Sequence, residues 1–547
     1  MSELRNFFTI NQDGNYLASI CRMGKTYKIR GADRLRKAVV NGYDVVVDTS
    51  FQEGDIIVYF PPECAISETF LSHNNLYRYS HYMKNENKAD VDYLLDKARR
   101  AKDGGNDEEY EILHNEAISL CGFFPPTGRV RALKIKNQVS VGFVVSFDAF
   151  WETYFGSENP LSNDEKESLV GMFFDTLTID GNEEKVCWKY LTQKEINIME
   201  NERRHREKMS VSIEERVRKR IEMAFRKAKG ILIPGEFQFH YPTKMLNTTI
   251  NELNPRDIVT VTVKIHGTSV VIANVLCNKK LSWWQKFLGK SDKEYRNVFS
   301  SRWSIKNEDL NPDAANGGYY KGESVYAAAN NLLKPYVKEG MTIYAEIVGY
   351  LPGSDTMIQP YHDYGCKIGE WKVMPYRITT DMVKGEVGTK NEWDVKVVRA
   401  WTLSLINNHP DIADKIMPIE ILYNGQLGKM YPDIDENSPT WHEELLEHIK
   451  SDKERLLMEE DEPLCTMFHE EMESLSNEIK SKPRDKELKE RLKAIKEMLA
   501  PREGIVIRKD GDLTPEAWKI KSLRHYLLAT KLHDAGFEDM EEQQESC

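Results

Sequence analysis

The sequence predicts an α+β protein made of short strands, with charged helical stretches inserted between some of them. Residues 261–272 give a strong strand signal, because β-branched residues surround a lysine and a glycine in Val-Thr-Val-Lys-Ile-His-Gly-Thr-Ser-Val-Val-Ile. Alternating β-branched residues are typical of strands, and an interior glycine marks a turn or a close backbone approach. The helical signal comes from polar stretches near 84–119 and 425–500, whose mixed charges are typical of solvated helices.

Length and composition indicate a globular chain of several domains. The 547 residues allow roughly two to four domains if each takes roughly 150 residues. A hydrophobic content of 40% and a charged content of 30% are ordinary for a globular protein. The first residues contain no apolar signal core, no apolar run reaches the length of a membrane span, and the eight cysteines include no C-x-x-C pair. We therefore expect a cytoplasmic protein with reduced thiols and no membrane segment.

The net charge of −12 bears on contacts with nucleic acid. A protein that binds nucleic acid is expected to be basic where it meets phosphate, so an acidic balance counts weakly against such a function. Local clusters decide binding, however, and the acidic excess can lie in the inserted helical stretches.

Four short stretches place particular charged residues inside otherwise apolar strands. Strands buried on one face usually alternate with polar residues that are interchangeable, so these charged residues are unusual. In chain order they are Lys264-x-x-Gly267, Glu346-x-x-Gly349, Glu503-Gly-Ile-Val-Ile and Lys519-x-Lys521. This ordered set resembles the covalent nucleotidyltransferase superfamily, which contains ATP-dependent ligases and mRNA capping enzymes. The first stretch reads Lys-Ile-His-Gly, with His where many members have Asp, and is most similar to the fifth family of RNA ligases.

The resemblance, together with the composition of the stretches between the motifs, predicts the domain organisation. Residues 1–192 are expected to form an OB-like β-barrel that binds nucleic acid, with a helical insertion near 84–119. Residues 193–230 form a basic helical stretch, which either binds phosphate or simply connects two domains. Residues 231–547 are expected to form the nucleotidyltransferase domain of antiparallel sheets and helices, with a helical insertion near 425–500.

The resemblance also implies the site and its chemistry, with Lys264 as the nucleophile. A lysine amine attacks phosphorus only when unprotonated, and its usual pKa is about 10.4, so neighbouring cations that disfavour a further positive charge are expected beside it. The implied catalytic residues are Lys264, Glu346, Glu503, Lys519 and Lys521. The implied ATP-binding residues are Lys264, Ile265, Gly267, Arg302, Glu346, Tyr376, Glu503, Lys519 and Lys521.

Individual roles within that set follow from the same resemblance. Glu503, and after it Glu346, would hold Mg²⁺ or Mn²⁺, because these hard cations prefer oxygen ligands. Tyr376 matches the aromatic residue that stacks on the purine, although Arg377 stands where family members often have Asp. Arg302 matches the basic residue that contacts the ribose or phosphate. His266 would either contact the AMP phosphate or hold the turn, and both interpretations stay open.

The implied reaction joins a 3′-hydroxyl end of RNA to a 5′-phosphate end, at nicks in duplexes, and the expected protein is a monomer. Lysyl-AMP forms first, AMP then moves to the 5′-phosphate, and the 3′-hydroxyl finally displaces AMP. The alternatives are a DNA ligase, a capping guanylyltransferase, and an inactive protein that binds nucleic-acid ends. Capping enzymes usually have an OB domain after the last lysine motif, and the stretch after Lys521 is too short for one.

Two further stretches suggest nucleic-acid contacts. Residues 128–136 alternate basic and apolar side chains, which predicts one core face and one face that presents Arg129, Arg131 and Lys134. A small barrel with basic and aromatic side chains suits phosphate tracking and base stacking, although a solvated strand face is the alternative. The tryptophans of Leu-Ser-Trp-Trp-Gln-Lys-Phe-Leu at 281–288 would either stack on a base or pack a loop, and we expect the latter.

Overall fold

The computed structural model describes residues 2–11, 16–78, 87–179, 181–190, 230–240, 243–279, 281–288, 291–302, 304–307, 309–310, 324–385, 387–511 and 516–535. The chain divides into two compact units, Met1–Glu215 and Arg216–Cys547. The division falls within the basic stretch 193–230, which lies outside the described residues except for Gly230. None of the described helices is both long and apolar enough to cross a lipid bilayer.

The first unit is built from short strands around an aromatic core. Its strands are β1 (Phe8–Thr9), β2 (Ala18–Arg22), β3 (Thr26–Lys28), β4 (Leu35–Val40), β5 (Tyr43–Asp48), β6 (Ile56–Phe60), β7 (Cys64–Ile66), β8 (Ala132–Ile135), β9 (Gln138–Val141), β10 (Phe143–Ser146), β11 (Phe173–Phe174), β12 (Thr176–Ile179), β13 (Asn182–Lys185) and β14 (Cys187–Lys189). Its helices are α1 (Ser2–Arg5), α2 (Glu68–His73), α3 (Asn87–Asp103), α4 (Asp107–Ser119), α5 (Phe147–Phe155) and α6 (Asn163–Leu169).

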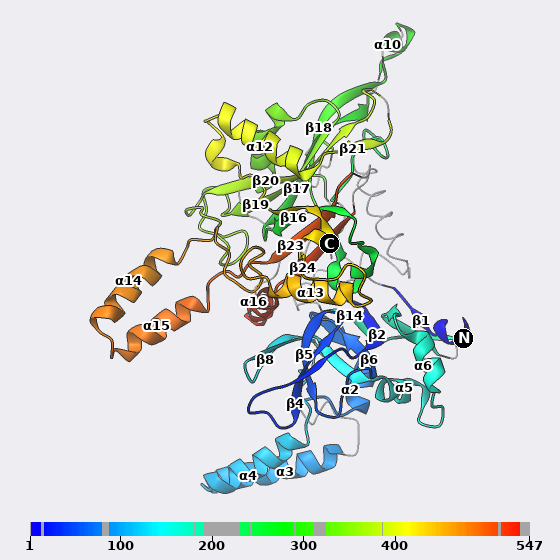
Figure 1. The fold of residues 1–547 in the computed structure, drawn as a ribbon, viewed down its shortest axis with the longest axis vertical. Coiled ribbons are helices and arrows are strands. Elements are labelled where there is room, and N and C mark those ends of the chain that lie inside the picture. The colour runs from blue at the N-terminus through cyan, green and yellow to red at the C-terminus, as the bar shows by residue number, and fades with distance from the viewer. Residues whose placement is uncertain are drawn as a thin grey trace. The chain divides into compact units, whose positions relative to one another are not determined.

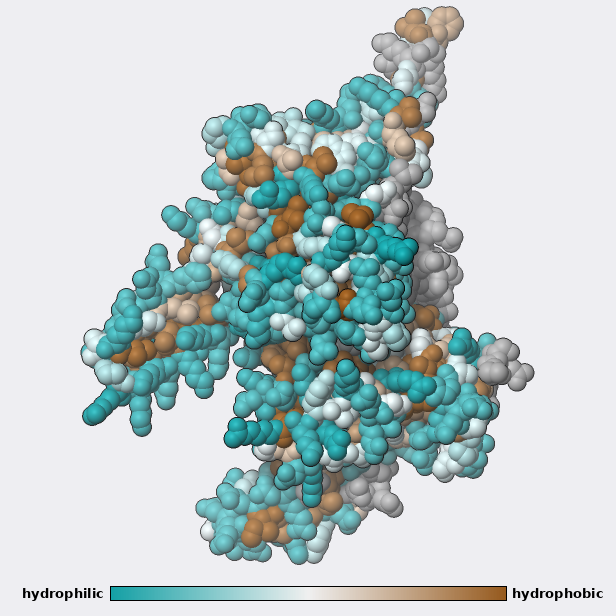
Figure 2. Space-filling model, in the orientation of Figure 1, coloured by the Kyte–Doolittle hydropathy of each residue, from teal (hydrophilic) through white to brown (hydrophobic). Residues whose placement is uncertain are grey.

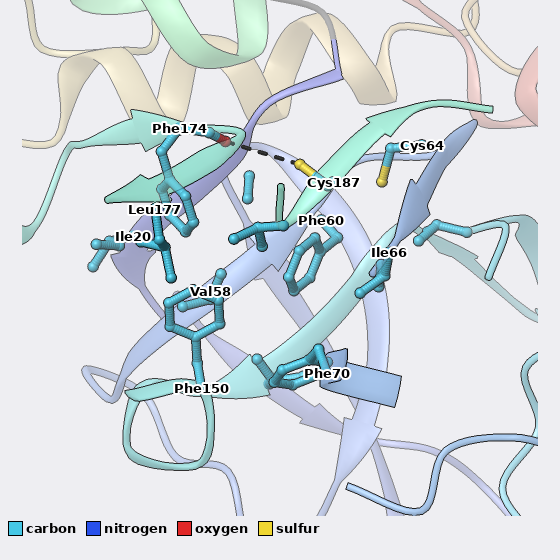
Figure 3. Close-up of a cluster of buried hydrophobic side chains, with 14 of the residues drawn as sticks. Ile20, Val58, Phe60, Cys64, Ile66, Phe70, Phe150, Phe174, Leu177 and Cys187 are labelled. Atoms are coloured by element: carbon cyan, nitrogen blue, oxygen red, sulfur yellow. Dashed lines mark hydrogen bonds between the residues drawn. The ribbon is translucent and has the colours of Figure 1, made fainter. Parts of the chain in front are cut away.

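Strand pairing in this unit produces five small sheets. Their orders are β10-β6-β2-β11, β1-β12-β13, β3-β4-β5, β14-β7 and β8-β9. Figure 3 shows the core that they enclose, where Phe60, Phe70, Phe150 and Phe174 gather beside the buried thiol of Cys187. Among the residues that the structure describes, no pairing closes these sheets into a barrel. The described strand order therefore shows several small sheets and not the closed barrel expected of an OB-like domain.

The helical stretch near 84–119 consists of α3 and α4, which run side by side (Figure 1). Its base is held together by the chain on either side: the Asn75 side-chain amide donates to the Leu120 carbonyl at 2.7 Å, and the Gly122 amide donates to the Tyr77 carbonyl at 3.0 Å. The helical hairpin is therefore an insertion whose two ends meet.

The second unit contains two five-stranded sheets. Its strands are β15 (Lys244–Met245), β16 (Ile258–Lys264), β17 (Thr268–Asn278), β18 (Lys293–Ser301), β19 (Met341–Gly349), β20 (Trp371–Asp381), β21 (Lys390–Glu392), β22 (Ile421–Gln426), β23 (Gly504–Lys509) and β24 (Ala517–Lys521). Its helices are α9 (Leu246–Thr249), α10 (Trp283–Phe287), α11 (Val325–Leu333), α12 (Val395–Asn408), α13 (Trp441–Ser451), α14 (His469–Ser481), α15 (Lys486–Lys496) and α16 (Leu523–Asp534). One sheet has the order β15-β24-β23-β16-β22 and the other β18-β17-β19-β20-β21.

The segment after Lys264 crosses from one of these sheets to the other. β16 belongs to one sheet and β17 to the other, so residues 265–267 carry the chain from sheet to sheet. β16 and β17 do not pair as a hairpin, because each strand finds its partners elsewhere in the chain: β16 pairs with β22 and β23, and β17 pairs with β18 and β19.

Two helical segments stand away from the sheets. The strands β17 and β18 lead to α10, where Trp283 is 66% exposed and Trp284 is 59% exposed, with apolar surface at the end of the segment (Figure 2). This exposure overturns the expectation that the tryptophans pack a loop. The tract around Pro483 forms the hairpin of α14 and α15 (Figure 1), with the chain closed at its base by a 2.8 Å hydrogen bond from the Glu462 amide to the Ala500 carbonyl.

Candidate active site

Lys264 ends β16, and strand register places two further lysines beside it. Lys264 pairs with Gly504 of β23, and Gly504 pairs on its other side with Lys521 of β24. Lys519, two residues earlier on β24, pairs with Val506. Because side chains two apart on a strand share a face, the Lys-x-Lys spacing puts both amines on one face of β24.

Glu503 lies directly before β23 and is enclosed by the lysines. Its side chain is fully buried, with Lys264 Nζ 2.8 Å from Oε2 and Lys521 Nζ 3.2 Å from Oε1. Burial opposes ionisation, but these two ammonium groups outweigh it and hold the pKa of the Glu503 carboxyl well below its usual range. Glu503 is thus a buried carboxylate whose charge is compensated by the candidate nucleophile and Lys521.

Gly267 and Glu346 meet where the crossing segment passes β19. Glu346 is buried and pairs with Ser269 of β17. A Cβ on Gly267 would overlap the Ile347 carbonyl oxygen and lie 2.8 Å from Glu346 Cγ. The amide of Gln359 donates to the Gly267 carbonyl at 2.9 Å, which fixes the segment. Glycine is required here because the backbone approaches β19 directly.

Tyr376 is the extra residue of a β-bulge. Tyr344 pairs with Arg377, whereas its neighbour Ala345 pairs with Pro375, so Tyr376 has no partner in the register. A bulge bends the strand and re-aims a side chain. The Tyr376 hydroxyl lies 2.8 Å from His240 Nδ1, and burial raises the pKa of Tyr376.

Arg377, which stands where the resemblance expects Asp, has a structural partner. Its guanidinium donates to Glu392 Oε2 at 2.7 Å and lies 4.6 Å from the centre of the Tyr344 ring. Glu392 also accepts from Arg508 Nη1 at 3.1 Å. The three charged groups form one network beside the site.

An open cavity lies beside Lys264. Six of the residues predicted from the sequence line it: Lys264, Ile265, Arg302, Glu346, Tyr376 and Lys519. The other three predicted ATP-binding residues, Gly267, Glu503 and Lys521, are not among the residues that line it. Glu503 contacts both Lys264 and Lys521, and Gly267 packs against Glu346.

Two histidines flank Glu503 and provide nitrogen donors. His266 Nδ1 lies 3.7 Å from Glu503 Oε2, and His525 Nε2 lies 3.7 Å from Glu503 Oε1. One donor atom from each of the three residues can be chosen so that all lie within 4.8 Å of one another. Burial lowers the pKa of His525 well below its usual range, although Glu503 favours its charged form.

A third histidine, His362, packs against this group but is occupied by the backbone. Its Nδ1 lies 2.9 Å from the Pro360 carbonyl and its Nε2 lies 3.3 Å from the Pro501 carbonyl. Burial, and then the nearby His266, lower the pKa of His362 to about 4. The neutral ring stacks edge-on against His266, with centroids 4.9 Å apart, and so fixes the orientation of that imidazole.

In the first unit, the three expected nucleic-acid residues differ in exposure. Lys134 is exposed and Arg131 partly buried, but Arg129 is 5% exposed and donates to both carboxylate oxygens of Glu63, at 2.8 and 2.9 Å. The expectation that all three share one solvent face was therefore wrong. β8 begins only at Ala132, so the period-two pattern does not extend back to Arg129.

Comparison with protein-family models and with curated proteins gives no match. Among solved structures, the chain is similar to a Naegleria gruberi RNA ligase. A mutant of that ligase with AMP and manganese is 14% identical, with a TM-score of 0.39, over 93% of this chain and 98% of that one. The ligase with pyrophosphate is 15% identical, with a TM-score of 0.40, over 95% and 99% of the two chains. A mutant with ATP and manganese is 15% identical, with a TM-score of 0.40, over 93% and 98%.

Several residues of the site were missed by sequence reasoning. His240, Glu392 and Arg508 line the cavity, and His362 and His525 pack around His266. Signals existed for two of them, because Arg508 directly follows the Glu503-Gly-Ile-Val-Ile stretch and His525 follows Lys521 by four residues. The other three come from segments without a motif, and only the tertiary fold brings them to the site.

Proposed function

We propose that this protein is an ATP-dependent RNA ligase that joins 3′-hydroxyl and 5′-phosphate ends through lysyl-AMP and RNA-adenylate intermediates, at nicks in duplex RNA. The observation that carries the proposal is the setting of Lys264. The strand-end amine of Lys264 lines an open cavity together with the cations Arg302 and Lys519. The order of the four motifs, which resembles covalent nucleotidyltransferases, supports the same chemistry.

In the first step, the Lys264 amine attacks the α-phosphorus of ATP and pyrophosphate leaves. The amine contacts Glu503 at 2.8 Å, so it must leave this ion pair and lose its proton before it attacks. Arg302 and Lys519 face the same cavity and would neutralise the phosphate oxygens as negative charge develops on them. Tyr376 would stack on the purine, and Glu346 would bind the ribose.

In the second step, the 5′-phosphate of RNA attacks the phosphorus of lysyl-AMP and releases Lys264. In the third, the RNA 3′-hydroxyl attacks the activated 5′-phosphate and AMP leaves. The same cations, with Lys521, would serve each step because every transition state spreads negative charge over phosphoryl oxygens. Arg131 and Lys134 would contact RNA phosphate, while Arg129 supports the strand from inside through Glu63.

The proposed reaction uses Mg²⁺ or Mn²⁺, which when bound neutralises charge on the phosphates. The donor set fits such an ion, because Glu503 offers a buried carboxylate and Glu346 offers a second one in the cavity wall. These two residues would hold it.

The decisive experiment is incubation with α-labelled ATP and divalent metal, followed by denaturing electrophoresis. Wild type should retain the label, and Lys264→Ala should not. Lys264→Arg is the matched control, since it keeps a positive charge beside Glu503 but supplies no lysine nucleophile, and it should also remain unlabelled. Label on either variant would refute the assignment of the nucleophile.

The same assay separates the alternatives. A capping-type enzyme would take label from α-labelled GTP instead of ATP. A DNA ligase would seal a nick between DNA strands in preference to RNA. An inactive end-binding protein would bind the nicked duplex but acquire no label from either nucleotide.

A further inference from the structure

Four large apolar side chains stand exposed together in and beside α10, between β17 and β18. Trp283 and Trp284 are 66% and 59% exposed, and Phe287 and Leu288 are 80% and 68% exposed. Figure 2 shows the apolar surface that they form at the end of the segment. Single exposed apolar residues are ordinary, but a contiguous group of them marks a surface that binds a partner. We call these four residues the apolar tip.

The strands below the tip carry it away from the rest of its sheet. β17 pairs with β19 only from Thr268 to Ala273, whereas it pairs with β18 as far as Asn278. The connection is closed at its base, where the Lys279 amide donates to the Asp292 carbonyl at 2.6 Å. A two-stranded stem therefore holds the tip beyond the end of β19 (Figure 1).

The charge around the tip is positive, in a chain that is acidic as a whole. The sequence from Lys279 to Lys293 contains five lysines and one acidic residue, whereas the net charge of the chain is −12. One of these lysines, Lys279, is paired with Glu294 at 2.6 Å. Tryptophans with lysines beside them are typical of segments that lie at the boundary of a bilayer, with the rings at the level of the headgroups and the ammonium groups on anionic lipids.

We propose that the apolar tip inserts into the surface of an anionic lipid bilayer, as a peripheral contact that needs no membrane-spanning helix. Its composition and ring geometry favour lipid over a nucleic-acid strand. The rings of Trp283 and Trp284 lie with centroids 3.8 Å apart and planes 30° apart, so each ring covers one face of the other. Base stacking uses open ring faces along a basic groove, and Leu288 has no ring to offer. The contact is independent of the reaction proposed for Lys264.

The test is co-sedimentation of the full-length protein with vesicles of phosphatidylcholine, either alone or mixed with phosphatidylserine. Wild type should bind the mixed vesicles, and its binding should fall as salt rises, because salt screens the attraction between lysines and anionic headgroups. Trp283→Ser with Trp284→Ser should weaken binding by on the order of tenfold or more, the factor that burial of one large apolar side chain typically supplies.

Ile368→Ser is the matched control, because Ile368 is 70% exposed and lies outside the tip. It should bind vesicles as wild type does. Vesicles that contain brominated lipid should quench the tryptophan fluorescence of wild type and of this control more than that of the double variant. Labelling from ATP should be the same in all three proteins, because none of the substituted residues lines the cavity beside Lys264.

Three results would overturn the proposal. The first is binding that is equal in wild type and the double variant, or equal on neutral and mixed vesicles. The second is a double variant that loses affinity for nicked RNA while wild type binds no vesicles, which would make the tip an RNA contact. The third is a wild-type dimer in sedimentation velocity that the double variant lacks, again without vesicle binding, which would assign the tip to a second copy of the chain.

Discussion

Gly267 packs directly against β19, in the segment that joins β16 to β17. Its missing side chain leaves room for Glu346 Cγ and the Ile347 carbonyl, so the segment that follows Lys264 packs directly against the strand of the acid that lines the cavity. At the residue scale, the site depends on such close approaches as much as on the charged groups themselves.

Gly267→Ala should destabilise the protein by about 1–3 kcal/mol, because the added methyl group forces either strand to shift. It should also weaken labelling from ATP, since Glu346 moves with the strand. Gly388→Ala is the matched control: nothing lies within 4 Å of the position of its added Cβ, and a change of less than about 0.5 kcal/mol is expected. Denaturant unfolding measures both, and equal stability of the two variants would contradict the packing argument.

The buried thiols lead to a second prediction at the residue scale, on how the free energy of unfolding depends on pH. Burial raises the pKa of Cys21 and of Cys187 to about 12, from an ordinary value of 9.0. Between pH 9 and about 12 the unfolded chain loses these protons and the folded chain keeps them, so the free energy of unfolding should fall as pH rises through this window. Cys21→Ser should make that fall shallower. A pH dependence identical to that of wild type would argue against the buried thiol as a source.

At the scale of elements, strand register aligns residues that lie far apart in the chain. Lys264, Gly504 and Lys521 lie in one row across three strands, and the bulge in β20 sets Tyr376 apart from the pairing of its neighbours. The helical hairpin of α14 and α15 contributes none of the residues that line the cavity, and its chain ends meet at Glu462 and Ala500. The sheets that carry the site are therefore independent of the hairpin.

Replacing residues 469–497 with a short Gly-Ser linker should leave the protein folded and labelled by ATP. Two point substitutions test the same idea. Leu445→Ala removes a side chain of α13 that is buried against β16, and it should lower the free energy of unfolding by about 2–5 kcal/mol. Leu475→Ala lies within the hairpin and should leave labelling from ATP unchanged. A folded deletion variant that takes no label would show that the hairpin takes part in nucleotide binding.

At the scale of the whole molecule, every residue proposed for lysyl-AMP formation belongs to the second unit. That unit has its own buried clusters, which include both sheets and α11, α12 and α13. The first unit has a separate aromatic core and carries the exposed Lys134. Nucleotide chemistry and RNA binding are thus expected to be separable.

A fragment from Arg216 to Cys547 should form the covalent adenylate but bind and seal nicked RNA poorly. In the full chain, Arg131→Ala with Lys134→Ala should weaken RNA binding and make its salt dependence shallower, because each lost phosphate contact lowers the slope. Adenylylation should not change. An unaltered salt slope would remove the RNA-contact proposal for these residues while leaving the chemistry of Lys264 in place.

The sequence by itself determined the α+β class, the helical stretches and four of the charged residues that line the cavity, Lys264, Arg302, Glu346 and Lys519, because strand patterns and the Lys-x-Lys spacing are local properties. Only the tertiary structure decided that β16 and β17 belong to different sheets and that Arg129 is buried against Glu63. It also decided that His362 and His525 pack against His266. These features depend on pairings between residues far apart in the chain. A local pattern cannot specify such pairings, since register is set by the burial of all the strands together.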